Sequence, residues 1–474
     1  MPMPTFPITP ALRHLLETIR AAGGRPYVVG GAVRDCLMGR AATRDVDVEV
    51  FRLSLAELEA ALAARFRVDA VGRSFGVLKV AVEDVVFDVS VPRAEIKTGR
   101  GHRAFHVEPE PQLNFAAAAS RRDLTINAIG WDPEANRFED PHGGIEDIAR
   151  CRIRHVGPAF AEDPLRVLRV CRFAARFDFT IDPTTLALCR TLRPELTTLP
   201  VERLWEEWKK LLLESKRPAV GLDALVSTES LTLFPNLQAM LHVAQDPEWH
   251  PEGQDHVLGS LWVHTGLVVD AAVRVLADDA IEDEEERLIV LLGALCHDLG
   301  KPSTTEFRDG RWRSLGHESA GEAPARSFLA QIGCPPRIIE AVVPLVLDHL
   351  KPFDFYRGGA SSAAIRRLAL RVPIPRLCRV ARADFLGRTT PEALACTDSR
   401  ELESITWLLE RADELNVIDA APKPLLMGRH LLALGVHPGT EMGTILKAAF
   451  EAQLEGSFSD ETGALDWAKQ HLGP

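Results

Sequence analysis

The sequence predicts an α+β domain at the N-terminus, followed by a chain that is helical to its end. Residues 1–150 alternate between strand-like and helix-like patterns, whereas apolar residues recur at helical spacing from residue 162 onward. A chain of 474 residues also exceeds one ordinary domain, so roughly three to four units are expected. We place their boundaries at 1–150, 151–250, 255–400 and 401–474.

The composition excludes several classes of protein. With 55 basic and 67 acidic residues the net charge is −12, which argues against a general basic coat and leaves only local basic patches. Aromatic residues make up 6%, so an extended stacking platform for single strands is not expected. The chain has no uninterrupted run of about 18 apolar residues and no signal pattern, so we expect no membrane span. Its 8 cysteines lack C-x-x-C pairs, which indicates free thiols in a reducing cytoplasm.

The first strand and helix are joined by a glycine turn. Glycines at such a turn let backbone N–H groups approach a phosphate closely. Neither G-x-G-x-x-G nor G-x-x-x-x-G-K-[ST] occurs, which excludes the usual dinucleotide-binding and P-loop interpretations. The turn and its flanks read Val28-Val29-Gly30-Gly31-Ala32-Val33-Arg34-Asp35.

A pair of carboxylates follows the glycine turn. Asp45 and Asp47 are two residues apart on a segment in which Val46, Val48 and Val50 alternate, so both aspartates point to the same face. Two adjacent carboxylates repel unless a cation lies between them, and Mg²⁺ with substrate phosphates is the usual solution. Each feature alone is commonly just a turn or a solvated strand end. Together they indicate metal-assisted chemistry on a nucleoside triphosphate.

The rest of the first domain contains a helix, two strands and a loop. Residues 53–66 predict an amphipathic helix, and residues 77–91 predict two alternating strands. Asp88 lies on the second of these strands, where it can be a solvated strand-end carboxylate. Residues 92–120 predict a flexible loop whose positive charge suits a nucleotide or RNA backbone, or only solvent. Its basic residues are Arg93, Lys97, Arg100 and Arg103.

A helix that follows Glu162-Asp163-Pro164 carries arginines along one side. Acids and a proline at its start are typical of a helix N-terminus. The arginines are spaced by three, three and four residues, which places them on one face. A stripe of this kind, without a matching acidic stripe on the same helix, is unusual for a helix that is merely solvated. Its members are Arg166, Arg169, Arg172 and Arg176.

These motifs together resemble the class II tRNA nucleotidyltransferase and bacterial poly(A) polymerase family, which belongs to the polymerase-β-like nucleotidyltransferase superfamily. Three further segments resemble family motifs: Arg121-Arg122-Asp123-Leu124-Thr125-Ile126-Asn127, Asp140-Pro141-His142-Gly143-Gly144 and the E-R-x-x-x-E-x-x-K pattern at 202–210. We interpret the last as structural, ordering the neck helices through pairs such as Glu206 to Lys210. The resemblance implies a nucleotidyltransferase head followed by an all-α neck and body that recognise RNA and base.

The resemblance also implies roles for individual residues. Asp163 would accept a hydrogen bond from the exocyclic amine of cytosine or adenine, and Arg166 would donate to the ring acceptors beside it. Uracil and guanine would place a carbonyl against the carboxylate and be rejected. The catalytic acids are Asp45, Asp47 and Asp88, of which Asp45 and Asp47 hold Mg²⁺, and the nucleotide-binding residues are Gly31, Arg34, Arg122, Asp163, Arg166, Arg169 and Arg172.

Histidines and aspartates recur on successive helices in the second half of the chain. One histidine on a helix is more often a core or surface residue than a ligand, but the order H…HD…H…H…D is much more specific. This stretch resembles the HD domain, an all-α metal-dependent phosphohydrolase fold. The resemblance implies a divalent transition metal or Mg²⁺ held by His264, His297, Asp298 and Asp384, with His317 and His349 contacting a second metal or the substrate.

The resemblance implies template-independent addition of C and A to the 3′ end of tRNA, using CTP and ATP in a two-metal mechanism. The appended HD domain would hydrolyse phosphomonoesters or 2′,3′-cyclic phosphates, unless it is a decayed scaffold. Three alternatives stay open. They are a CC-only or A-only enzyme, a poly(A) polymerase, although residues 450–474 lack the expected basic tail, and an HD phosphohydrolase with an RNA-binding head. Protein partners are not indicated.

Overall fold

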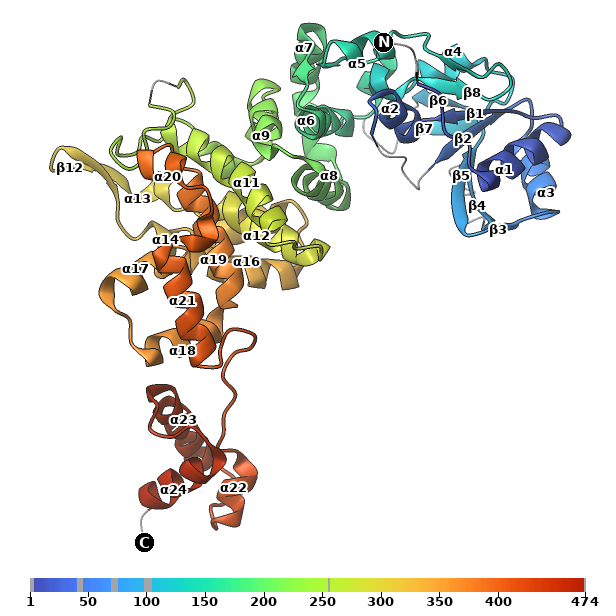
Figure 1. Cartoon of the computed structure of the whole chain (residues 1–474). Coiled ribbons are helices and arrows are strands. Elements are labelled where there is room, and N and C mark those ends of the chain that lie inside the picture. The colour runs from blue at the N-terminus through green and yellow to red at the C-terminus, as the bar shows by residue number, and fades with distance from the viewer. Residues whose placement is uncertain (1–3, 41–45, 70–75, 98–104, 255, 473–474) are drawn as a thin grey trace. The chain divides into compact units, whose positions relative to one another are not determined.

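The structure is a computed structural model that describes residues 4–40, 46–69, 76–97, 105–254 and 256–472 (Figure 1). The chain divides into two units, Met1–Leu233 and Phe234–Pro474, so residues 234–250 group with the second unit. The first unit combines a mixed sheet with helices, and the second is helical apart from one short hairpin among the described residues. This arrangement confirms the predicted fold class.

The head is built on a seven-stranded sheet with the order β3-β4-β5-β2-β1-β8-β9. Strand β1 pairs antiparallel with β2 and β8, while β2 pairs parallel with β5. The two strands predicted within residues 77–91 are confirmed as β4 and β5. The strands are β1 Arg25–Val29, β2 Asp47–Phe51, β3 Arg67–Asp69, β4 Val77–Val82, β5 Val85–Ser90, β8 Gly130–Asp132 and β9 Arg137–Glu139.

The two faces of the sheet are covered differently. Helices α1 (Pro10–Ala21) and α3 (Leu55–Ala63) cover one face, where Val28, Val48 and Val50 are buried (Figure 1). The other face packs against the short helix α4 (Phe115–Ala119). Because strand side chains alternate between faces, the odd-numbered residues of β2 point to this second face. The acidic residues of β2 therefore lie on the side of the sheet opposite to α1 and α3.

Residues 92–120 do not form the predicted loop throughout. Strands β6 (Arg93–Lys97) and β7 (Phe105–Pro109) pair as an antiparallel two-stranded sheet, and α4 follows. Charged residues interrupt both strands, so their apolar alternation is too weak to predict a strand from sequence. Arg100 and Arg103 lie outside the described residues.

The neck consists of helices that pack around α6. Helix α6 (Leu165–Phe177) confirms the helix predicted after Pro164, and it packs against α8 and α9. Apolar residues of α6 such as Val167 and Val170 are fully buried, which fixes the opposite, arginine-bearing side. The remaining helices and strands of the first unit, in the head and the neck, are α2 Gly31–Leu37, α5 Gly144–Ala149, β10 Arg152–Ile153, β11 Thr180–Ile181, α7 Pro183–Leu192, α8 Val201–Glu214 and α9 Pro218–Ser227.

The second unit is a helical domain whose centre is formed by α11, α12, α16 and α19. Its elements are α10 Pro235–Gln238, α11 Ser260–Asp278, α12 Glu284–Cys296, α13 Lys301–Thr304, β12 Thr305–Arg308, β13 Arg311–Ser314, α14 His317–Ala320, α15 Glu322–Gln331, α16 Pro336–Asp348, α17 Lys351–Gly358, α18 Ser362–Arg371, α19 Ile374–Leu386, α20 Pro391–Ala395, α21 Glu403–Glu414, α22 Gly428–Ala433, α23 Thr440–Glu455 and α24 Glu461–His471. The last three build a small apolar cluster of their own.

Helix α11 is the one helix of the described chain that is long and apolar enough to cross a membrane by length and composition. Its residues Leu261, Val268 and Val275 are fully buried, and it packs against α12 and α19. It is therefore a core helix of this domain.

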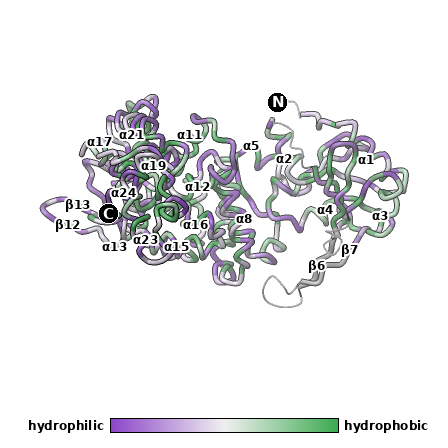
Figure 2. The backbone as a smooth tube through the Cα atoms, turned by 90° about the horizontal axis from the view of Figure 1, so that it is seen from below, coloured by the Kyte–Doolittle hydropathy of each residue, from purple (hydrophilic) through white to green (hydrophobic). Residues whose placement is uncertain are grey.

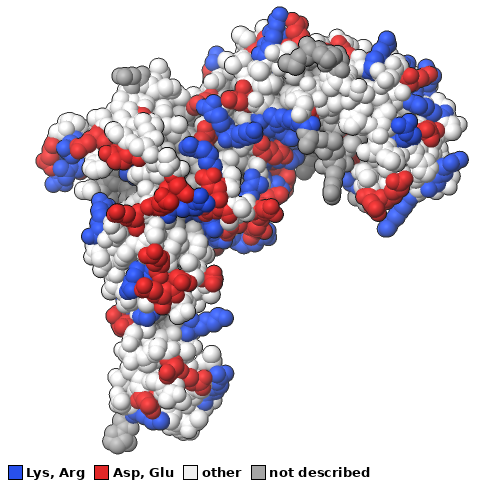
Figure 3. Space-filling view, in the orientation of Figure 1, with Lys and Arg blue, Asp and Glu red and all other residues white. Residues whose placement is uncertain are grey.

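Figure 2 shows hydrophobic and hydrophilic residues alternating along the helices of both units, and Figure 3 shows acidic and basic residues mixed over the visible face.

Candidate active sites

The glycine turn brings the end of β1 close to the start of β2. Gly30 has φ 73°, a left-handed conformation that favours glycine. A Cβ atom at this position would lie 2.8 Å from Oδ2 of Asp47. The glycine is therefore required twice, once for its backbone conformation and once for the close approach of the Asp47 carboxylate.

Three acidic side chains share the face of the sheet beside this turn. In the parallel pairing of β2 and β5, Asp47 lies opposite Asp88, and Glu49 follows two residues further on. Asp88 pairs with Lys79 at 2.9 Å and Glu49 with Arg122 at 3.2 Å. Carboxylate oxygens are the ligands that Mg²⁺ prefers, so Asp47 and Asp88 suit this ion. Asp45, the other predicted Mg²⁺ ligand, lies outside the described residues.

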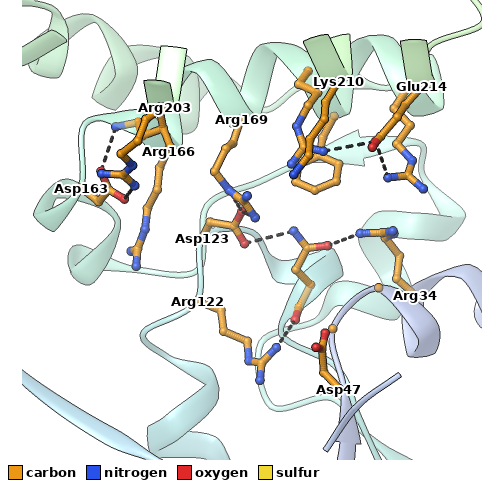
Figure 4. Close-up of a pocket in the computed structure, with 17 residues that line it drawn as sticks. Arg34, Asp47, Arg122, Asp123, Asp163, Arg166, Arg169, Arg203, Lys210 and Glu214 are labelled. Atoms are coloured by element: carbon orange, nitrogen blue, oxygen red, sulfur yellow. Dashed lines mark hydrogen bonds and ion pairs between the residues drawn. The ribbon is translucent and has the colours of Figure 1, made fainter. Parts of the chain in front are cut away.

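A pocket of about 620 Å³ lies between this turn and the arginine face of α6 (Figure 4). Basic side chains outnumber acidic ones in its lining, which suits a polyanion such as a triphosphate. Its walls come from the glycine turn after β1, from α2, β2, α6 and α8, and from the segment around Arg122. All the predicted nucleotide-binding residues line it together with Asp47, namely Gly31, Arg34, Arg122, Asp163, Arg166, Arg169 and Arg172.

Arg34 is held rigidly in the wall of the pocket. Its side chain is only 4% exposed, donates to Asp35 at 2.8 Å and to Asn127 at 2.6 Å, and lies over the ring of Phe177. Burial disfavours its charge and lowers its pKa, and the Asp35 carboxylate opposes this effect. A guanidinium fixed by such partners loses little side-chain freedom when it meets a phosphate.

The arginines of α6 are not solvated, because acids from other elements meet them. Arg169 pairs with Asp123, Arg172 with Glu207 and Arg176 with Glu214, each at 2.7 Å. These partners were not predicted, since the argument from sequence compared charges on α6 alone. Burial would raise the pKa of Asp123, but Arg169 and Asn127 outweigh burial and lower that pKa to about 2.

The residues predicted to read the base lie at the start of α6. Asp163 accepts two hydrogen bonds from Arg203, at 2.7 and 3.3 Å (Figure 4). Arg166 donates to the backbone carbonyls of Ala159 and Arg121, at 2.6 and 2.8 Å. Both side chains are thus oriented by the protein while they still line the pocket.

Residues of the 202–210 motif tie α8 to α6, consistent with the structural role predicted for the motif, and they also line the pocket. Arg203, Lys210 and Glu214 of α8 line the pocket, and Glu207 pairs with an arginine of α6. Their spacings of four, three and four residues place them on one face of the helix, which is a signal that the sequence already carries. The predicted pair of Glu206 with Lys210 is replaced by one of Glu206 with Lys209 at 3.1 Å.

In the second unit the predicted histidines and aspartates come together as two adjoining groups. Each group offers ligand atoms within 4.8 Å of one another: His264, His297 and Asp384 in one, and Asp298, His317 and His349 in the other. Asp298 was expected to join the first group. Its Oδ2 does face that group, 3.1 Å from Nε2 of His297, while its Oδ1 faces the second group, 3.3 Å from Nε2 of His317. A carboxylate in this position can bridge two metal ions.

The histidine tautomers suit metal binding. Nδ1 of His297, His317 and His349 each donates to a backbone carbonyl three residues earlier, at 2.7 to 2.8 Å. Nε2 is therefore left with its lone pair directed into the cluster. The Nε2 atoms of His317 and His349 face each other at 3.4 Å. Within the described chain, Nε2 of His297 and both oxygens of Asp298 are buried without a well-formed hydrogen bond.

The charges in the cluster also favour a cation. Burial would raise the pKa of Asp298, but His297 and Lys301 outweigh burial and hold it well below its usual range. Burial acts against Asp384 in the same way, and Arg388 and His264 hold its pKa well below the usual range. Burial lowers the pKa of His349 to about 3, so its imidazole is neutral and able to bind a metal. The residues present therefore fit one or two divalent cations.

Two residues of this site were missed by sequence reasoning. Oε1 of the buried Glu252 lies 2.8 Å from Nδ1 of His264 and 2.9 Å from Nδ1 of His250. Glu252 thus orients His264 so that its Nε2 faces Asp384 at 3.1 Å. Both missed residues lie in an irregular segment, where no periodicity marks a buried position.

Family models match three successive parts of the chain. Residues 26–154 match the poly A polymerase head domain, residues 178–241 the probable RNA and SrmB-binding site of polymerase A, and residues 256–388 the HD domain. Together with the basic pocket beside Asp47, the head defines a nucleotidyltransferase, and an HD domain follows it in the same chain.

Sequence identity to named relatives identifies the family. The chain is 36% identical over 377 residues to the multifunctional CCA protein of Stenotrophomonas maltophilia strain K279a, which covers 76% of this chain and 86% of the relative. It is 38% identical over 316 residues to the multifunctional CCA protein of Mannheimia succiniciproducens, which covers 65% of this chain and 70% of the relative. The chain belongs to the family of multifunctional CCA proteins.

Solved structures share the fold. The CCA-adding enzyme of Bacillus stearothermophilus in complex with CTP matches with a TM-score of 0.63 and 21% identity over 98% of both chains. The CCA-adding enzyme of Thermotoga maritima complexed with tRNA matches with a TM-score of 0.57 and 19% identity, over 97% of this chain and 94% of that one.

Proposed function

We propose that the protein adds C and A nucleotides to the 3′ end of tRNA, from CTP and ATP and without a template. The observation that carries this proposal is the single pocket that holds Asp47, the phosphate-binding arginines and the Asp163–Arg166 pair. Relatives named multifunctional CCA proteins support it. So do structures of the same fold that were solved with CTP, ATP and tRNA.

The catalytic acids would act through bound Mg²⁺ next to the reacting phosphate. Asp45 and Asp47 would hold Mg²⁺, with Asp88 beside them, and the metal would lower the pKa of the tRNA 3′-hydroxyl and stabilise the leaving pyrophosphate. Arg122 lies next to the Asp47 turn, where its guanidinium can neutralise triphosphate oxygens. Arg169 and Arg172 continue this positive surface along α6.

Base selection falls to the start of α6. A carboxylate has about four lone-pair sites, so Asp163 can accept from an exocyclic amine while Arg203 holds it from the other side. Arg166, fixed by two backbone carbonyls, can offer its remaining N–H groups to the ring acceptors of cytosine or adenine. Uracil and guanine would set a carbonyl against Asp163, which costs the hydrogen bond and places two acceptor oxygens against each other.

The decisive experiment is nucleotide incorporation on a tRNA transcript that lacks its CCA end, with CTP alone, ATP alone and both. We expect two additions with CTP and a third only when ATP is present. A stop after two additions with both nucleotides would identify a CC-adding enzyme. A single A on a CC-ended transcript would identify an A-adding enzyme, and a long ladder with ATP a poly(A) polymerase.

We also propose a second activity, metal-dependent hydrolysis of phosphate esters, at the HD cluster. Two adjoining ligand groups that share Asp298 are the observation that favours it. Their nitrogen-rich ligands suit a divalent transition metal, with Mg²⁺ as the alternative. Hydrolysis of p-nitrophenyl phosphate with Ni²⁺, Mn²⁺ or Mg²⁺ tests the proposal, and alanine at His297 or Asp298 should abolish it. No hydrolysis by the unaltered protein with any of these metals would refute it.

All eight cysteines are free, so we place both activities in the cytoplasm.

A further inference from the structure

The HD cluster is bordered by a pocket that the two proposed activities do not explain. Its volume is about 430 Å³, within the range of about 300 to 1,000 Å³ that is typical of ligand sites. Three largely buried residues of the cluster and its surroundings line it: His317, His250 and Lys301. His317 belongs to the second ligand group, so a molecule in this pocket lies next to the expected site of hydrolysis.

Two exposed tryptophans line the same pocket. Trp249 is 55% exposed and Trp312 is 38% exposed, although indole rings are usually buried. Large aromatic surfaces left open to solvent beside a cavity are typical of ligand-binding sites. The low aromatic content of the chain excludes an extended stacking surface but not a single pair of rings.

Local structure holds both tryptophans in place. Trp312 lies on β13 opposite Phe307 of β12, and the two ring centroids are 5.1 Å apart. Trp249 follows a turn in which Asp246 accepts from the backbone of Glu248 at 3.0 Å. An ion pair of Glu248 with Arg311 at 2.9 Å joins this turn to β13. The hairpin and the turn therefore form two connected walls.

The pocket is also basic. Its lining includes Lys301, Arg311, Arg313, Arg357 and Arg388, whereas Asp246 is its acidic residue among the described side chains. Arg313 and Arg357 pair with carboxylates in exposed positions, where ion pairs are weak and exchange readily for a phosphate. Aromatic rings beside guanidinium groups are the combination by which proteins hold nucleotides without reading their sequence.

We propose that Trp249 and Trp312 form a nucleobase subsite of the HD domain, which selects nucleotides over small phosphate esters. The inference rests on the hydrolase activity proposed for the same cluster. In the reaction, the oxygen of water attacks the phosphorus of a nucleoside 3′-monophosphate and the bond from phosphorus to the ribose oxygen breaks. A proton of the attacking water passes to the ribose oxygen, so that inorganic phosphate and the nucleoside leave. The tryptophans hold the base while the cluster receives the phosphate.

The test compares adenosine 3′-monophosphate with glycerol 2-phosphate, an ester that has no aromatic ring. We expect Trp312→Ala and Trp249→Ala each to lower the ratio of kcat/KM for the nucleotide to that for the glycerol ester about tenfold, through KM. Trp312→Phe keeps a stacking ring and should restore most of the ratio. Arg308→Ala is the control, because Arg308 is exposed on the same hairpin but does not line the pocket, and this variant should leave the ratio unchanged.

A binding measurement separates this inference from the activity on which it rests. Equilibrium dialysis of labelled adenosine 3′-monophosphate, with EDTA present, should show Trp312→Ala binding about tenfold more weakly than the unaltered protein. If binding is equal in both proteins, or if the alanine variants lower kcat/KM for both esters alike, the subsite is refuted. If the dialysis difference is found but no ester is hydrolysed, the hydrolase proposal fails and the nucleobase subsite stands.

Discussion

At the scale of single residues, carboxylates form ion pairs with most of the arginines that line the pocket and thereby hold them in position. Asp123 is one of these carboxylates, and both Arg169 and Asn127 contact it in a buried position. The pKa of Asp123 is lowered to about 2, against about 3.9 for an unfolded chain. Its charged form is therefore more stable in the folded protein than in the unfolded one.

The pH dependence of stability follows from this shift. A depressed carboxyl pKa contributes stability above the unfolded value, and this contribution is lost as the pH falls from about 4 towards about 2. We expect Asp123→Asn to lower the free energy of unfolding by about 2 kcal/mol at pH 7. Urea unfolding of both proteins at pH 7, 5, 4 and 3 measures the difference, which should be constant down to pH 5 and about half as large at pH 3. An unchanged difference at pH 3 would contradict the assignment.

Arg203 is the residue that sequence reasoning undervalued most. Two of its N–H groups hold Asp163, and the backbone N–H of Leu165 donates to the same carboxylate at 3.1 Å. Without Arg203 the carboxylate loses two of these three donors, so its discrimination between an amine and a carbonyl should weaken. We expect Arg203→Ala to raise misincorporation from UTP, relative to CTP, about tenfold. Single-turnover addition to a tRNA transcript with each nucleotide measures the ratio.

The control for this variant is another arginine of the neck. Arg193 is exposed and pairs with Glu229 at 2.9 Å, away from the pocket. Arg193→Ala also removes an arginine side chain, but one that does not contact Asp163, so the ratio of UTP to CTP incorporation should not change. If Arg203→Ala also leaves the ratio unchanged, Arg203 does not orient the base-reading carboxylate.

At the scale of elements, features carried by neighbouring residues could be predicted and partnerships between distant ones could not. The glycine turn, the strand of Asp47 and the helix after Pro164 follow from local spacing, which the sequence displays directly. Arg203 and Asp163 are 40 residues apart, and no pattern along the chain selects one as the other's partner. His250 lies in an irregular segment, where periodicity gives no information on burial.

The turn between β1 and α2 gives a prediction with a close internal control. Gly30 and Gly39 both have a positive φ, 73° and 65°, so alanine should strain the backbone at each position, by about 1 kcal/mol or more. A Cβ at Gly30 would also push against the Asp47 carboxylate, whereas nothing lies within 4 Å of a Cβ at Gly39.

We therefore expect the two variants to differ in activity more than in stability. Gly39→Ala should lower the melting temperature by a few degrees and leave nucleotide addition nearly intact. Gly30→Ala should lower the melting temperature by at least as much and reduce kcat for CTP addition at least tenfold, because Asp47 is displaced. Equal activity in the two variants would show that the Asp47 position tolerates the shift.

At the scale of the whole molecule, the two proposed activities use separate residues in separate units. The nucleotidyltransferase pocket is lined by residues of Met1–Leu233, and the HD cluster by residues of Phe234–Pro474. The order of these units could be predicted because each carries its own motifs. The grouping of residues 234–250 with the second unit could not, because it depends on contacts such as those of Gln245 with Lys301 and of Asn236 with Ser327.

Separate sites predict separable losses. Asp47→Ala should reduce addition of C and A to background while hydrolysis of phosphate esters continues, since Asp47 has no part in the second unit. Asp298→Ala should abolish hydrolysis, because Asp298 faces both ligand groups, while addition to the tRNA transcript continues. Both assays on both full-length variants, with circular dichroism to verify folding, measure the four outcomes. The loss of addition in a folded Asp298→Ala protein would mean instead that the HD unit takes part in binding tRNA for the transfer reaction, and the two activities would then belong to one cycle.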